Sequence, residues 1–253
     1  MIYSRVINLE KRTVTLDGET LNTFDVADVA NGHAIVTIAD SAMMRVQMAR
    51  NVVDRIVEGD ETVYGINTGF GSLVHTRISS DDVELLQLNL IRSHATGLGP
   101  KLSTEIVRAM MCVRLNSLVK GHSGCHPDVI NQLVDFINHS ITPIVPRIGS
   151  LGASGDLAPL SHLACALVGE GRVEYQGKIM DAMEAIRRCE LAPLVLRAKD
   201  GLSLINGTSL ITGMLSLAVE QLRQLLTYSD IIAGMSIDCL LYTSDAADEG
   251  HCV

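Results

Sequence analysis

The residues with the most unusual chemistry are Ala153-Ser154-Gly155, in the middle of the run from Gly149 to Leu160. In a tightly bent loop, the Gly155 nitrogen can attack the Ala153 carbonyl carbon and close a five-membered ring. Loss of one water there and of a second from the Ser154 side chain leaves an exocyclic methylidene group on an imidazolone. The small residues on both sides of the serine allow the tight turn that ring closure needs. The product would be an electrophile, whereas ordinary side chains supply nucleophiles, acids and bases.

The same tripeptide also fits an unreactive, glycine-rich turn between a strand and a helix, so the flanking residues must decide. Four segments together resemble the histidine and aromatic amino-acid ammonia-lyases: Tyr64–Gly71, Ser93–Gly97, Gly149–Ala164 and Leu204–Thr208. They follow one another in the family's order, and the resemblance extends from about Val14 to about Asp238. In that family the tripeptide forms a methylidene-imidazolone (MIO) prosthetic group. The resemblance therefore implies an MIO group formed from Ala153-Ser154-Gly155 and no diffusible cofactor.

Tyr64 begins a loop with three glycines that lacks the Gly-Lys-Ser/Thr ending of a phosphate-binding loop. Glycines at such positions let the backbone approach a ligand closely, and we place Gly65 among the substrate-binding residues. The resemblance implies that Tyr64 is the base that removes the β-proton of an amino-acid substrate. An unperturbed tyrosine has a pKa near 10, so the site would have to stabilise the tyrosine anion.

Ser93 and His94 lie at the expected end of a helix, before Gly97 and Gly99. A histidine there can simply interact with the helix dipole. The resemblance instead implies that the pair lines the pocket around the substrate side chain. The order Ser-His is typical of histidine ammonia-lyases and is shared by some tyrosine aminomutases.

Asn206 lies ahead of a long helix expected from about Thr208. An asparagine at such a position often caps the helix that follows. The resemblance implies another role, in which the amide lies beside the MIO oxygen and the substrate carboxylate or amine. We favour this second role.

Asp156 and Pro159 are suited to the start of a helix directly after the tripeptide, Asp156 as its N-cap and Pro159 in its first turn. The free N–H groups and the positive dipole end of that helix would stabilise negative charge that develops on the ring. We expect His162, about two turns further on, to pack rather than to catalyse.

His122, Cys125 and His126 form a local cluster of residue types that bind zinc. Their spacing matches no standard zinc pattern, and the resembled family has a loop there. We therefore expect no metal site in this segment.

The composition favours packed aliphatic helices, because 47% of the 253 residues are hydrophobic while only 3% are aromatic and none is Trp. The net charge of −9 argues against nucleic acid as a partner. Apolar runs such as Leu163–Val168 are too short to cross a membrane, and the first residues lack the apolar region of a signal peptide. The six cysteines show no paired spacing. We therefore expect reduced thiols in a cytoplasmic protein.

Along the chain, local signals predict helices with few strands. A short strand is expected before the Asp17-Gly18 turn, a helix from about Ser41 carries Met44, Met48 and Val52 on one face, and a hairpin centres on Gln176-Gly177. Pro143 and Pro146 predict extended backbone. Further helices are expected near 81–95, 103–119, 127–139, 156–168 and 208–235. The fold expected is mainly α, and the resemblance implies an elongated helical bundle of the ammonia-lyase (fumarase/aspartase-like) type with a small mixed α/β N-terminal part.

Residues 1–238 are expected to be the N-terminal half of an ammonia-lyase that contains the MIO-forming region. Residues 239–253 end the helical pattern abruptly and resemble a translated sequencing adapter, so we expect a non-native tail there, although a genuine polar tail is the alternative. The family's second tyrosine, its carboxylate-binding arginine and an acidic pocket residue normally lie beyond this stretch. The resemblance also implies a homotetramer whose active sites combine residues from several subunits.

The function expected is MIO-dependent elimination of ammonia from L-histidine to give trans-urocanate. A tyrosine or phenylalanine ammonia-lyase and a 2,3-aminomutase remain alternatives. Pro146–Leu151 favours them, because histidine lyases more commonly have Lys-Gly-Ser-Val there. An alternative of another class is an inactive, truncated helical fragment.

Overall fold

The structure is a computed structural model that describes residues 11–59, 62–63, 65–68, 80–151 and 155–248. Tyr64, Ala153 and Ser154 lie outside the described residues. The elements are β1 (Arg12–Leu16), α1 (Thr23–Ala30), β2 (Ala34–Ile38), α2 (Asp40–Glu58), α3 (Ser80–His94), β3 (Leu98–Lys101), α4 (Thr104–Leu118), α5 (Pro127–Asn138), β4 (Thr142–Pro143), β5 (Pro146–Ile148), α6 (Leu157–Leu167), β6 (Arg172–Tyr175), β7 (Lys178–Asp181), α7 (Ala182–Arg188), α8 (Asp200–Ile205) and α9 (Ser209–Asp248).

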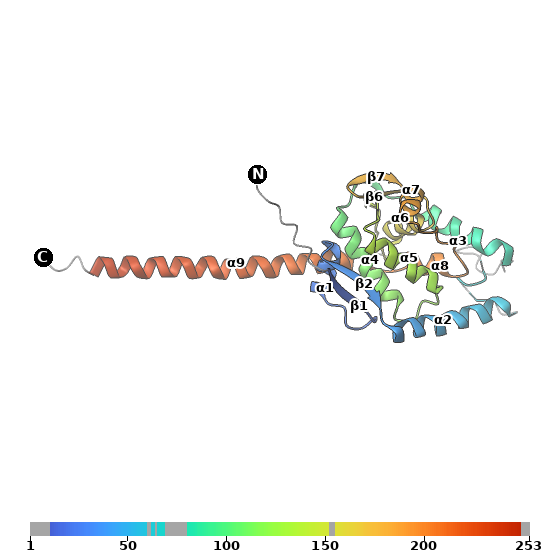
Figure 1. The fold of residues 1–253 in the computed structure, drawn as a ribbon, viewed down its shortest axis with the longest axis horizontal. Helices are drawn as coiled ribbons and strands as arrows, with labels where there is room; N and C mark the ends of the chain where they lie inside the picture. Colours follow the sequence, from blue (N-terminus) through green and yellow to red (C-terminus); the bar gives the residue numbers. More distant parts are fainter. Residues whose placement is uncertain (1–10, 60–61, 64, 69–79, 152–154, 249–253) are drawn as a thin grey trace.

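The molecule has a helical body from which α9 projects as a long rod (Figure 1). Helices α4, α5 and α6 supply much of the core, including the fully buried side chains Met110, Met111, Leu115, Ile130, Leu133, Phe136 and Leu160. These residues are aliphatic or aromatic, so their burial supplies most of the favourable free energy of folding. The mainly α fold expected from the composition is confirmed.

The small mixed part at the front is a β–α–β unit. Strands β1 and β2 pair in parallel, with Arg12 opposite Ala34 and Leu16 opposite Ile38, and α1 makes the connection between them. Asn138 at the end of α5 holds this unit to the body, because its amide exchanges two hydrogen bonds of 2.8 and 2.9 Å with the backbone of Val36 in β2.

Several local predictions are confirmed. A strand precedes Asp17-Gly18, Pro143 and Pro146 lie in strands, and β6 and β7 form the hairpin whose turn places Gln176 and Gly177 at φ +51° and +72°. A turn with positive φ at both central residues matches the twist of paired strands. The short elements β3, α7 and α8 were not predicted, because each spans too few residues to show a period.

The interpretation of α2 needs two corrections. Ser41 is not its N-cap, since the helix begins at Asp40 and the cap position is Ala39, which has no side chain that could bond. The stripe of Met44, Met48 and Val52 faces solvent, with 61%, 69% and 45% of each residue exposed. The face turned to the body carries Ala42, Val46, Arg50 and Val53 instead.

Helix α9 is longer than the predicted 208–235. Residues 236–248 contain neither glycine nor proline, the residues that most disfavour a helix, and the helix continues to Asp248. By length and mean hydropathy alone, the stretch Asp200–Leu240 meets the criterion for crossing a membrane. Core helices of water-soluble proteins meet the same criterion, so it is weak evidence. The expectation of short apolar runs concerned uninterrupted runs such as Leu163–Val168, whereas polar residues interrupt the stretch Asp200–Leu240.

Candidate active site

The pairing of β3 with β5 brings the end of α3 to the start of the tripeptide loop. Leu98 pairs with Ile148 across these strands. Beside that pair, a Cβ added at Gly149 would lie 3.3 Å from the Cα of Gly97. Two glycines therefore allow the segment after His94 and the segment before the tripeptide to touch backbone to backbone.

Asp156 connects the tripeptide loop to α9. Its amide donates a 2.6 Å hydrogen bond to the Gly207 carbonyl. Its carboxylate Oδ2 accepts from the amides of Leu210 and Ile211 at 2.8 and 3.1 Å, while Oδ1 accepts from the Ser150 hydroxyl at 2.8 Å. The residue is completely buried.

The cap that Asp156 makes differs from the one predicted. It occupies the N-cap position of α6, but its side chain makes no capping bond to that helix. It caps α9 instead, because the first free N–H groups of α9 face it. A carboxylate at a helix N-terminus satisfies unpaired donors and complements the dipole there.

Gly155 and Gly207 lie in close contact. Gly155 has φ +91°, and a Cβ added to it would lie 2.2 Å from the Gly207 carbonyl oxygen. No other residue fits such a position without moving the backbone. This glycine-only cradle beside the tripeptide fits an MIO group formed from it, since ring closure requires a compressed backbone at Gly155.

A cavity of about 200 Å³ lies at this junction. Its lining consists of Ser93, His94, Thr96, Gly149, Leu151, Gly155, Leu157 and Ala158. The structure thus brings together three of the predicted site residues, Ser93, His94 and Gly155, from segments about 60 residues apart.

The hydrogen bonds of His94 determine which ring nitrogen can face a ligand. Nδ1 lies 2.9 Å from the Leu90 carbonyl oxygen and 3.0 Å from the Ser93 hydroxyl, which itself lies 2.9 Å from the same carbonyl. Since a carbonyl oxygen only accepts, Nδ1 carries a hydrogen and donates it. In the neutral ring Nε2 is then the acceptor.

Asn206 is the C-cap of α8, through its backbone amide, which donates to the Leu202 carbonyl at 3.1 Å. Its side chain is exposed and has no hydrogen bond to another described residue. It therefore does not cap α9, and the amide can bind a ligand. The following residue, Gly207, contacts Gly155, so Asn206 lies next to the tripeptide loop.

Gly65 lies elsewhere. It is buried with φ +74°, and the adjacent Ile66 packs against Val53 and Val83. Val83 and His94 are eleven residues apart on α3, about 16 Å along the helix axis. The structure does not bring Gly65 to the cavity beside His94.

Two further histidines, His126 and His162, have structural partners. His126 caps α5 by accepting from the Asp128 amide at 3.2 Å, and His162 Nε2 accepts from the Gly97 amide at 3.1 Å. Burial raises the pKa of the Cys125 thiol to about 12. In the described part of the chain, no three His, Cys, Asp or Glu side chains are grouped to hold a metal ion.

Comparison with known proteins identifies the family to which this chain belongs. The family model for aromatic amino acid lyases matches residues 21–251. The chain belongs to the aromatic amino acid lyase family. The histidine ammonia-lyase of Staphylococcus aureus (strain JH9) is 47% identical over 234 residues, which cover 92% of this chain and 46% of that protein. The chain therefore spans about half the length of the curated relatives it matches.

Solved structures of this family share the fold. Histidine ammonia-lyase from Trypanosoma cruzi matches with a TM-score of 0.79 at 39% identity, over 84% of this chain and 41% of that chain. Tyrosine aminomutase from Streptomyces globisporus matches with a TM-score of 0.77 at 40% identity, over 82% of this chain and 39% of that chain. The ammonia-lyase fold expected from the resemblance is confirmed.

Sequence reasoning missed two features of the site. Gly207 was assigned no role, because its close approach to Gly155 depends on the tertiary fold. Arg114 was not considered, because a lone arginine in a helical pattern has the signal of an exposed residue.

Proposed function

We propose that this chain supplies the MIO-forming half of an ammonia-lyase that converts L-histidine to trans-urocanate and ammonia. The observation that carries the proposal is that Gly155, Ser93 and His94 line the same cavity. Gly207, which follows Asn206, packs against Gly155 beside that cavity. The identity to a relative named histidine ammonia-lyase supports the choice of substrate.

The MIO group would supply an electrophilic carbon for the substrate amine, which no standard side chain offers. Around that group, the chain's own residues would hold the backbone in place and supply an electrostatic field. Asp156 and Gly207 hold the backbone of Gly155, and the N-terminus of α6 places a positive partial charge beside it. Asn206 would hydrogen-bond the substrate carboxylate or amine through its free side-chain amide.

His94 would select substrates whose ring carries a hydrogen-bond donor. Nε2 of the neutral ring can accept from an imidazole N–H or a phenol O–H, because Nδ1 already donates to Leu90. A phenyl ring in the cavity would cover this acceptor and leave it unpaired, and such a loss discriminates strongly between substrates. Histidine and tyrosine are therefore favoured over phenylalanine, and a tyrosine lyase or a 2,3-aminomutase remains the second candidate, supported by the likeness to the tyrosine aminomutase.

Tyr64 would remove the β-proton of the substrate. Its neighbour Gly65 lies at the other end of α3 from His94, so the base would reach the cavity from another subunit of a homotetramer. We place the enzyme in the cytoplasm, with free cysteines and with neither nucleic acid nor membrane as a partner.

The test uses this chain joined after Asp238 to the C-terminal half of the S. aureus relative. The mass of the parent should fall by about 36 Da, the loss of two waters. Ser154→Ala should retain one of those waters, keep the fold and lose turnover. Tyr64→Phe should complete the modification yet lose about 10²–10⁴ in rate, as expected for a general base.

L-histidine, L-tyrosine and L-phenylalanine are offered in parallel, and urocanate, coumarate, cinnamate and β-amino acids are measured. An unmodified tripeptide in an active protein would exclude the proposal. Turnover of phenylalanine alone would show that His94 does not select as described. No turnover of any substrate by the joined protein would favour the inactive fragment.

A further inference from the structure

Arg114 is a buried guanidinium directly behind the turn that carries Asn206. It belongs to α4 and is 3% exposed. Its Nη2 donates to the Ser203 carbonyl oxygen, in the last turn of α8. A Cβ added at Gly207 would lie 2.3 Å from Nη1 and 3.4 Å from Cζ, so the Nη1 end of the guanidinium packs against that glycine.

The charge of Arg114 has no carboxylate partner among the described residues. Its Nε also lacks a hydrogen-bond partner there. Burial lowers the pKa of Arg114 to about 10, which still leaves the group charged at neutral pH. An unpaired buried charge is costly, so a requirement other than stability is the natural reason for it.

The surroundings of the turn Asn206–Thr208 show what the charge does. Arg114 lies at the C-terminal end of α8, where the helix dipole is negative. Asp156 lies on the first amides of α9, where the dipole is positive. A cation on one helix end and an anion on the next therefore hold the turn from both sides.

We propose that Arg114 is a positioning residue for the reaction, which holds Asn206 and Gly207 against Gly155. It acts by fixing the Gly207 carbonyl where it accepts the Asp156 amide and presses on Gly155. The inference rests on the proposed function, because its chemical consequence is formation of the MIO group. In that reaction the Gly155 nitrogen bonds to the Ala153 carbonyl carbon and two waters leave, so no further reactant is needed.

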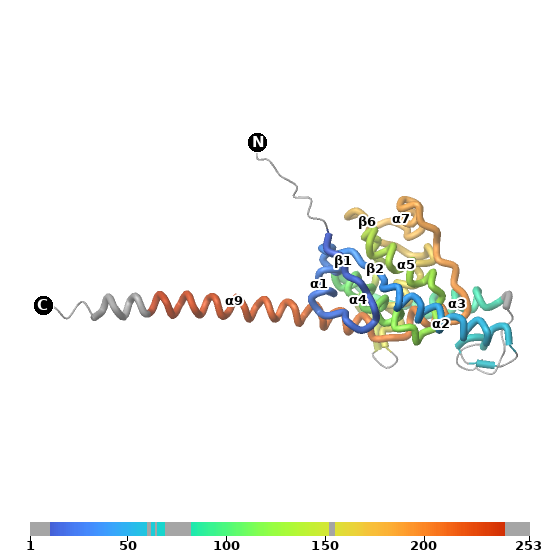
Figure 2. The backbone as a smooth tube through the Cα atoms, turned by 60° about the horizontal axis from the view of Figure 1, so that its bottom comes forward, coloured from blue at the N-terminus to red at the C-terminus, as the bar shows by residue number. Residues whose placement is uncertain are grey.

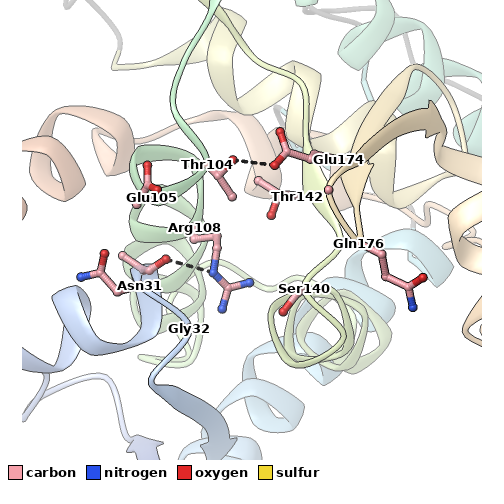
Figure 3. A pocket seen from close by; sticks show the side chains of 11 residues that line it. Asn31, Gly32, Thr104, Glu105, Arg108, Ser140, Thr142, Glu174 and Gln176 are labelled. Carbon is pink, nitrogen blue, oxygen red and sulfur yellow. Dashed lines mark hydrogen bonds between the residues drawn. The ribbon is translucent and has the colours of Figure 1, made fainter. Parts of the chain in front are cut away.

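The same helix offers a matched control in Arg108. It is also buried, and it donates to the carbonyls of Val29, Ala30 and Ile137, at the ends of α1 and α5. It lines a separate cavity of about 310 Å³ together with Thr104 and Glu174. Figure 3 shows these side chains around the cavity. Burial lowers the pKa of Arg108 as well. Arg108 thus matches Arg114 in helix, burial and type of partner but does not touch the site.

The test compares Arg114→Gln, Arg114→Lys, Arg108→Gln and Arg108→Lys in the joined protein used above. The first measurement is the rate at which the folded fraction loses about 36 Da. The second is hydrogen exchange at the Asp156 amide. We expect Arg114→Gln to slow the modification and to speed the exchange, each by at least about tenfold, because a hydrogen bond from a charged group is lost. Arg114→Lys should fall between it and the parent.

Both Arg108 variants should lower the unfolding temperature yet leave the two rates of the folded fraction unchanged. Equal rates in Arg114 and Arg108 variants would overturn the proposal. If Arg114→Gln does not fold, the two lysine variants decide by the same comparison. A parent that never loses 36 Da would refute the proposed function alone, and Arg114 would then be judged by the exchange of the Asp156 amide.

Discussion

The two ends of α9 have opposite surroundings. At the inner end, Ser209 and Leu210 are buried, and a Cβ added at Gly213 would lie 2.9 Å from the backbone nitrogen of Met110 in α4. At the outer end, every residue from 221 to 240 is exposed. Figure 2, turned from Figure 1, again shows this part of the helix away from the body.

The difference cannot come from side-chain type, because the outer end is as apolar as the inner end. Its exposed residues include Leu222, Leu225, Leu226, Ile231, Ile232, Met235, Ile237 and Leu240. Contiguous apolar surface of this size marks an interaction site. The inner end adjoins the candidate site and is packed against α4, whereas the outer end stays exposed, although Arg223 near its start donates to the Thr23 hydroxyl at 3.2 Å.

The largest expected effect concerns the outer end. Each large aliphatic side chain left in water forgoes about 1.5–3 kcal/mol, against a whole-protein stability of about 5–15 kcal/mol. The 253-residue chain alone should therefore aggregate and lack ammonia-lyase activity. Joining a family-type C-terminal half after Asp238 should restore solubility and turnover together, as measured by size-exclusion chromatography and product formation.

A control for this prediction changes the outer surface without adding a partner. Leu225→Glu with Ile232→Glu should raise the solubility of the short chain and leave it inactive. A soluble, compact and active parent chain of 253 residues would contradict the comparison between the two ends.

A smaller effect is expected from the glycines of the same helix. Gly213→Ala should lower the free energy of unfolding by about 1–3 kcal/mol, because its Cβ meets the backbone of α4. Gly234→Ala should instead stabilise the outer helix by up to about 1 kcal/mol, since no atom lies within 4 Å of its Cβ. Circular dichroism during denaturation of the soluble Leu225→Glu, Ile232→Glu variant of the short chain measures both. If Gly234→Ala is the more harmful change there, the outer end is not open in the folded chain.

The smallest expected effect is a pH dependence at the contact between His162 and Gly97. Burial lowers the pKa of His162 below its ordinary 6.5, and its Nε2 accepts from the Gly97 amide. A histidine with a depressed pKa in the folded state stabilises the fold above pH 6.5, and this contribution is lost as the pH falls through the folded value. Protonation also removes the acceptor for Gly97.

His162→Gln supplies a carbonyl acceptor that does not titrate. The unfolding temperature of this variant should therefore fall less between pH 7 and pH 5 than that of the parent. His139, exposed and bonded to the Asp135 carbonyl, is the matched control, and His139→Gln should follow the parent. Parallel curves for all three proteins would show that the contact between His162 and Gly97 carries no stability.

Local signals in the sequence determined several features of this protein. The tripeptide, the Gln176-Gly177 hairpin and the helices around α4, α5 and α6 each depend on residues within a few positions, and each was predicted. The resemblance to the lyase family predicted that Ser93-His94 and Gly155 lie in one site, because the motif residues of a family occupy known places in its fold.

Only the tertiary structure decided which partners the remaining groups find. Asp156 has the sequence signal of a cap, but its carboxylate caps a helix that begins 53 residues later. The face of α2 that carries Met44 is exposed, whereas the face that carries Val46 packs against the body, because the charged Arg50 on that second face hydrogen-bonds Asp200. Arg114 was buried by segments from α8 and Gly207. A local pattern encodes the period of a helix and the residue types at its ends. The choice between two faces, or between two helix ends, depends on backbone groups far along the chain that meet only after folding.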